Sequence, residues 1–288
     1  MPTAYLSGIV LILSAMFFLS LAGVIVRVLH VDEWTIVFWR SAFLTLTMLV
    51  VLAIIRRGRV AGAFRAAGRA GLVSGIAIGV AIVCYVFSIT RTTVANTLVL
   101  LATAPLFAAI LGMVLLKERV LPRTWAAIAF ACGGVALMFL ERMGAGELLG
   151  NLFAIVAAVL YSTSIVALRG SGEVNLIPAV CLAGLVSMLI TLPYADVTDV
   201  PLRDLAILAA MGVGQMGIGL VLFVFGAQRL PPAETALIGL LETILAPLWV
   251  WLAINEVPGD WVLIGGGVLF AAVLANTALS LRRRASFG

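Results

Sequence analysis

Long apolar runs dominate the chain, and charged residues, proline or glycine separate one run from the next. A run of about 20 apolar residues is long enough to cross the hydrocarbon core of a bilayer as a helix. We therefore predict an all-α integral membrane protein with ten transmembrane helices. The predicted spans are residues 5–28, 35–55, 70–90, 93–116, 121–140, 149–168, 176–194, 205–227, 233–254 and 259–281.

The second half of the chain repeats the pattern of the first. A shift of 138 residues places Arg91 on Arg229 and Glu118 on Glu256. Because each copy has an odd number of spans, the second copy must insert upside down relative to the first. We predict two inverted five-helix repeats, residues 1–142 and 143–288. Inverted repeats place a substrate site near the bilayer midplane at their interface and allow alternating access.

Composition and charge support this class. Hydrophobic residues make up 64% of the chain and charged residues 11%, which leaves no room for a soluble domain. The net charge of +5 would suggest nucleic acid in a soluble protein, but here the basic residues lie between apolar runs, where they report topology. Their distribution predicts both termini in the cytoplasm and a location in the cytoplasmic (inner) membrane, with the lipid bilayer as partner and no nucleic acid. The first run has no basic segment before it, so we expect it to be retained as a helix.

Cofactor and metal chemistry have little support in the sequence. Cys84, Cys132 and Cys181 lie inside spans without ligand-like spacing, and His30 is the single histidine. The G-x-G-x-x-G string at 212–217 lies inside an apolar span, so it indicates close helix packing or a hinge rather than a nucleotide fingerprint. We expect no cofactor, no metal and no catalytic residue.

Several short motifs resemble those of the EamA-type transporters of the drug/metabolite transporter superfamily. They are Phe38-Trp39-Arg40, the segment 229–237, Leu241-Glu242 and the segment 246–248. The resemblance covers essentially the whole chain. It implies a secondary transporter, since similar proteins carry amino acids, nucleosides, quaternary amines or organic anions, and many of them are exporters. One departure is Thr243, because proline often follows Leu-Glu in the family.

Two charged residues inside spans are the leading site candidates, because charge within a bilayer is costly and usually functional. Glu242 lies about 14 Å into its span and is read as a proton carrier, a counter-ion for a substrate amine, or a structural carboxylate. Arg40 lies about 8 Å into its span and either contacts an anionic substrate group, snorkels outward or pairs with a carboxylate at a helix end.

The remaining candidates are polar or aromatic residues in spans and residues at span ends. The substrate-binding or coupling set comprises Glu242, Arg40, Gln215, Tyr161, Trp249, Thr235, Asn96 and Tyr85. On the ninth span Thr235, Gly239, Glu242, Ala246, Trp249 and Ala253 form one narrow stripe, which we expect to face the cavity. The gate or structural set comprises Arg91, Arg229, Glu118, Glu256, Pro105 and Pro247. Interhelical hydrogen bonding is the competing reading for the uncharged polar members.

The sequence thus predicts an exporter of a small metabolite, such as an amino acid or a similar polar or amphipathic solute. An organic-anion carrier of the dicarboxylate type is the alternative within transport, and an intramembrane enzyme is the alternative of another class. The expected partners are a small-molecule substrate, the bilayer and, for coupled transport, protons. The oligomeric state is left open between monomer and homodimer.

Overall fold

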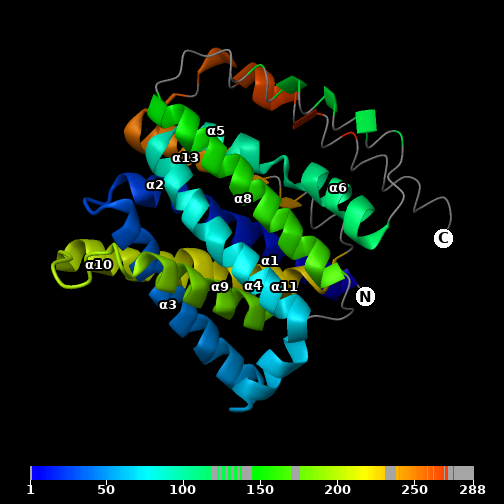
Figure 1. Cartoon of the computed structure of the whole chain (residues 1–288), viewed down its shortest axis with the longest axis vertical. Helices are drawn as coiled ribbons and strands as arrows, with labels where there is room; N and C mark the ends of the chain where they lie inside the picture. The colour runs from blue at the N-terminus through cyan, green and yellow to red at the C-terminus, as the bar shows by residue number, and fades with distance from the viewer. Residues whose placement is uncertain are drawn as a thin grey trace.

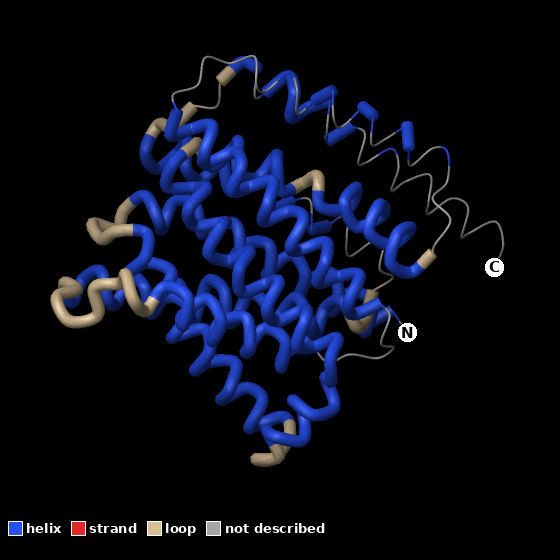
Figure 2. Tube along the Cα trace, in the orientation of Figure 1, coloured by secondary structure: helices blue, strands red, loops and turns tan. Residues whose placement is uncertain are grey.

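The computed structural model describes four long stretches of the chain, residues 2–117, 145–169, 176–230 and 241–257. Shorter described pieces are 122, 125–126, 129–130, 133–134, 137, 238–239, 259–261, 263–268, 270–271 and 275. The described residues form helices joined by short turns and include no strand (Figure 2). The predicted all-α class is confirmed for this part of the chain.

The described helices of the first half are α1 (Pro2–Ser20), α2 (Ala22–Arg27), α3 (Glu33–Ile55), α4 (Val60–Arg91), α5 (Val94–Leu101) and α6 (Ala104–Leu116). Those of the second half are α8 (Ala145–Arg169), α9 (Leu176–Thr191), α10 (Leu202–Ala209), the π-helix η1 (Ala210–Ile218), α11 (Gly219–Ala227) and α13 (Leu241–Ile254).

Six continuous segments of the described chain are long and apolar enough to cross a membrane. They are Tyr5–Arg27, Glu33–Ile55, Val60–Arg91, Val94–Leu116, Gly146–Leu168 and Leu202–Ala227. Two shorter apolar helices, Leu176–Thr191 and Ile244–Ile254, correspond to the seventh and ninth predicted spans. The fifth predicted span lies largely outside the described residues and the tenth is described only in pieces, so the count of ten stays a prediction.

Several helices differ from the simple spans that the apolar pattern predicts. α4 begins at Val60, with a non-helical Gly68 between its first turns and the apolar stretch. The fourth span is interrupted between α5 and α6, so Pro105 lies at the start of α6, where a missing N–H costs nothing. Pro247, in contrast, lies inside α13.

Short polar side chains fix where two of the helices begin. The Asp32 carboxylate accepts hydrogen bonds from the backbone N–H groups of Trp34 and Thr35, at 2.8 and 3.1 Å. The Thr93 hydroxyl accepts the N–H of Asn96 at 3.1 Å and caps α5 in the same way. Such caps satisfy N–H groups that have no partner within the helix.

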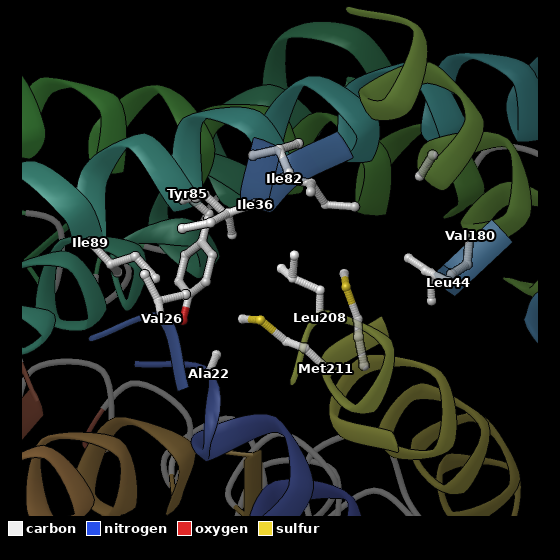
Figure 3. Packing of buried hydrophobic residues seen from close by; sticks show 14 of the residues in the cluster. Ala22, Val26, Ile36, Leu44, Ile82, Tyr85, Ile89, Val180, Leu208 and Met211 are labelled. Carbon is white, nitrogen blue, oxygen red and sulfur yellow. The ribbon is translucent and has the colours of Figure 1, made fainter. Parts of the chain in front are cut away.

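The helices of the two halves interlock (Figure 1). α8, the first helix of the second half, packs along α4, and α1, the first helix of the first half, packs along α11. α3 packs against α9 and η1, while α5 and α6 pack on α8. The main apolar core therefore draws residues from both halves, including Ala22, Leu44, Tyr85, Val180 and Met211 (Figure 3).

The outer surface of this bundle is apolar. Leu6, Leu46 and Val114 are 61%, 58% and 63% exposed, and many other large aliphatic side chains are exposed with them. A water-soluble surface rarely presents apolar patches of this extent. Contact with lipid chains explains the pattern.

Glycines allow several of these helices to approach closely. Gly75 and Gly79 of α4 lie against α9, where an added Cβ would come within 2.7 Å of Leu182 and 2.8 Å of the Ala183 carbonyl oxygen. An added Cβ on Gly212 of η1 would lie 2.5 Å from the Phe43 Cβ and 2.6 Å from the Arg40 carbonyl oxygen of α3. The close helix packing expected for the string at 212–217 is therefore present at Gly212.

We expect Gly212→Ala to lower stability by about 1–3 kcal/mol, because the new methyl group would overlap backbone and Cβ atoms of α3 that cannot rotate away. Gly214→Ala is the matched control, since no atom lies within 4 Å of its added Cβ. Thermal unfolding of both variants in detergent measures the difference. Equal melting temperatures would show that η1 does not rest on α3 in this way.

Candidate functional site

Four polar side chains from both halves interact electrostatically inside the bundle. Arg40 on α3 and Tyr85 on α4 come from the first half, and Tyr161 on α8 and Glu242 on α13 come from the second. The guanidinium carbon of Arg40 lies 5.8 Å from the centroid of the Tyr85 ring, within the range of a cation–π contact. We call these four residues the central cluster.

Arg40 is buried but has no anionic partner among the described residues. Its side chain is 3% exposed, so it does not snorkel outward. One terminal nitrogen, Nη2, donates to the Met216 sulfur at 3.1 Å, and a thioether is a weak acceptor. Nε and Nη1 are buried without a hydrogen-bond partner in the described ranges. The guanidinium therefore keeps donors available for another group.

Glu242 lies in the first turn of α13 and is partly exposed. It forms no ion pair with another described residue, although it interacts electrostatically with Arg40. On the same helix face Ala246 is buried, whereas Ala253 is exposed, so the predicted stripe does not remain interior to its end. The central cluster thus contains one buried cation and one partly accessible carboxylate.

Gln215 and Trp249 donate hydrogen bonds to residues at the break between α1 and α2 rather than to the central cluster. The Gln215 amide nitrogen donates to the Leu19 carbonyl oxygen at 3.0 Å, and its amide oxygen is buried without a partner. The Trp249 indole nitrogen donates to the Ser20 hydroxyl at 3.0 Å, and its ring packs edge-on against Phe17. Both contacts join the second half to the first.

Asn96 lies at the start of α5 and is 5% exposed. Its amide nitrogen donates to the Thr92 hydroxyl at 3.0 Å, while its side-chain oxygen has no hydrogen-bond partner among the residues described. No hydrogen bond, ion pair or ring contact joins it to Arg40 in the described part of the chain. The structure places Asn96 near the end of the bundle.

Charged residues tie together the end of the bundle at which α2 stops and α3 starts. Arg27 Nε lies 3.0 Å from a carboxylate oxygen of Glu256, and Arg27 also donates to the Thr92 carbonyl oxygen at 2.9 Å. The other Glu256 oxygen accepts the Val94 N–H at the start of α5 at 3.1 Å. A carboxylate at a helix N-terminus is favoured by the helix dipole. One ion pair thus connects α2, α5 and the end of α13.

Arg91 and Arg229 occupy corresponding places in the two halves. Arg91 forms an ion pair with Glu33 and lies over the Phe87 ring, 4.5 Å from its centroid. Arg229 is exposed and bonds to the Phe225 carbonyl oxygen at 3.5 Å. Gly150 of α8 packs on Arg91 and Thr92, and Gly8 of α1 packs on Arg229 and Leu230 in the same manner. The two halves therefore form corresponding contacts at these two sites.

Two candidates, Thr235 and Glu118, lie outside the described residues. Several partners were not singled out as site candidates from the sequence, namely Ser20, Arg27, Glu33 and Met216. Arg27 and Glu33 could have been identified, because a charged residue at the end of a span needs a partner of opposite charge at the same depth in the membrane. Ser20 and Met216 gave none, since both are common inside apolar helices.

An open apolar groove of about 570 Å³ runs beside the break between α1 and α2, and Arg40 and Glu242 do not line it. Its lining residues are Phe18, Leu21, Ile25, Ala209, Ala210, Val213, Gly214 and Gln215. Cys84 and Cys181 are buried free thiols. Within the described ranges no three His, Cys, Asp or Glu side chains are placed to hold a metal ion.

Comparison with known proteins adds a family and a fold. Residues 6–140 and 148–278 each match the EamA-like transporter family. The chain is 28% identical to the pseudopaline exporter CntI of Pseudomonas aeruginosa over 96% of this chain and 97% of that protein. It is 24% identical to human solute carrier family 35 member G1 over 74% of this chain and 62% of that protein. A crystal structure with 17% identity superimposes with a TM-score of 0.65 over 98% of both chains.

The two contacts at the α1–α2 break allow a test of the structural reading of Trp249. Trp249→Phe keeps the ring but removes the hydrogen bond to Ser20, so we expect a loss of about 0.6 kcal/mol and no more than about 1.7. Thermal unfolding measures it, with Trp251→Phe as control on an exposed position of the same helix. Loss of solute binding at unchanged stability would instead place the indole against the substrate.

Proposed function

Because the chain belongs to the EamA-like transporter family, we propose that it exports a small polar or amphipathic metabolite, such as an amino acid, by alternating access. Family membership makes it a membrane transporter rather than an enzyme. The central cluster carries the proposal, since helices of both halves meet there around a buried guanidinium with free donors. The relative named as an exporter supports the direction of transport.

The proposed orientation has both termini in the cytoplasm of a cytoplasmic membrane. Arg27, Glu33, Arg91 and Glu256 contact one another in pairs at one end of the bundle, and we assign this end to the outside. Arg56, Arg57 and Arg59 in the turn between α3 and α4 lie at the other end of α3 and belong inside by the positive-inside rule. A single chain supplies every member of the central cluster, so a monomer suffices for the site.

An organic-anion carrier is the alternative that the free donors of Arg40 favour. Glu242 weighs against a dianion, because a second negative charge would approach this carboxylate. The distinguishing result is saturable flux of dicarboxylates that amino acids do not inhibit.

The proposed function is tested by flux into and out of proteoliposomes loaded with amino acids, nucleosides, quaternary amines or dicarboxylates. We expect saturable, chemically unchanged flux of one class, with amino acids first. The same assay with and without a pH gradient, in wild type and Glu242→Gln, separates proton-coupled transport from exchange or uniport. Absence of protein-dependent flux for every class would overturn the proposal.

The ion pair between Arg27 and Glu256 lies at the proposed outer end of the bundle. It joins α2 of the first half to the end of α13 of the second, so opening toward the outside has to separate the two side chains. Both are partly exposed, at 25% and 22%, and such a pair contributes roughly 0–1 kcal/mol. We propose that it acts as a weak outer latch.

Glu256→Gln is expected to raise outside accessibility by up to about fivefold, the equivalent of about 1 kcal/mol. The readout is labelling of Asn96→Cys by a membrane-impermeant maleimide in a background without the native cysteines, because Asn96 lies two residues after Val94, whose N–H donates to Glu256. Glu33→Gln is the control, since its partner Arg91 belongs to the same half. Equal labelling in both variants would contradict the latch.

A further inference from the structure

We propose that Arg40 and Glu242 form the two charged ends of a site for a zwitterionic head group, with the substrate carboxylate on Arg40 and its ammonium group toward Glu242. The inference rests on the proposed function and names the substrate class that the central cluster selects. It excludes purely cationic and dianionic solutes as preferred substrates.

The first step is the unsatisfied guanidinium. Arg40 is 3% exposed, and both Nε and Nη1 lack a hydrogen-bond partner in the part of the chain that the structure describes. A buried cation left in this state is destabilising, because nothing replaces the water it has lost. A substrate carboxylate supplies the acceptor oxygens that are missing, and charge-assisted bonds of this kind are about twice as strong as neutral ones.

The second step is the accessible carboxylate. Glu242 interacts electrostatically with Arg40, Tyr85 and Tyr161, yet it remains partly exposed and has no ion-pair partner among the residues that the structure describes. In the proposed site, a solute that lies against Arg40 has Glu242 at its other end. An ammonium group is the charge that it attracts.

The third step is the balance of charge. The side chains of Arg40 and Glu242 together offer one positive and one negative charge in a low-dielectric interior. A zwitterion adds one charge of each sign and places each opposite its complement. A dicarboxylate would leave its second charge beside Glu242, and a quaternary amine would leave Arg40 without a partner, so both carry an electrostatic penalty.

The aromatic members of the cluster fit the same head group. The Tyr85 ring faces the Arg40 guanidinium at 5.8 Å and holds its plane from one side. Tyr161 packs beside Ala81, Cys84 and Ala157, so small side chains flank it. The apolar surroundings leave the charged head group as the part of the solute that the site orients.

The test uses purified full-length protein in detergent and three compounds for each of leucine, methionine and phenylalanine. These are the amino acid, its carboxamide and its deaminated acid, so that each charge is removed in turn with the side chain unchanged. Binding is measured by thermal shift and by titration calorimetry. For wild type we expect at least one zwitterion to bind at least about 30-fold more tightly than its carboxamide, in line with loss of one partner of a buried charge pair.

Variants assign each charge to one end of the site. Arg40→Gln should lower the affinity for the zwitterion by at least about 30-fold. The melting temperature of this variant without ligand should stay the same or rise, because an unpaired cation has been removed. Glu242→Gln should bind the deaminated acid as well as the amino acid. Arg56→Gln, at an exposed position directly after the same helix, is the control that should bind like wild type.

Each outcome decides the inference. Equal binding of a zwitterion and its carboxamide, no binding of any zwitterion, or unchanged binding in Arg40→Gln overturns it. The proposed function is scored separately by proteoliposome flux. Flux of solutes without a carboxylate would uphold transport and remove this head-group assignment, whereas zwitterion binding without flux would uphold the site and remove transport.

Discussion

The interior of this protein depends on one constraint, a buried guanidinium that has no carboxylate partner among the described residues. Removing a cation from water is costly, and the cost is greatest where no anion compensates it. Arg40 nevertheless lies at 3% exposure, held by a thioether and an aromatic ring. A sequence selected for stability alone would place an apolar residue there. Retaining the cation is consistent with a binding site whose stability is sacrificed for a ligand.

The π-helix η1 packs closely against α3, the helix that carries Arg40. Gly212 and Gly217 are five residues apart, which in an α-helix would leave them about 140° apart around the axis. In a π-helix the i→i+5 pattern returns them to one face, and both pack on α3, against Phe43 and Thr47. The close approach brings Met216 of the same element to the guanidinium. The glycines and the π-helical stretch therefore support the site together.

The sequence was informative wherever a residue type is expensive in a bilayer. Arg40 and Glu242 were identifiable because charge inside an apolar run needs a reason, and the structure brings both into one cluster with Tyr85 and Tyr161. The partners of charged residues could not be predicted where the two residues lie far apart in the sequence. Arg27 and Glu256 are brought together only by the fold. Nor did the apolar pattern reveal the break after Ser20 that receives Gln215 and Trp249, because no proline marks it.

The interlocked packing also constrains how the two halves can move. α8 belongs to the second half but lies along α4 of the first, and α1 belongs to the first half but lies along α11 of the second. Gly150 and Gly8 bring the ends of these pairs into close contact. Rocking the two sequence halves as separate rigid bodies would break both of these large interfaces. The tie between Arg27 and Glu256, by comparison, is a single partly exposed ion pair at the edge. Extensive packing between first and third helices of opposite halves therefore contrasts with the single ion pair at the bundle end, where we propose that access to the central cluster changes.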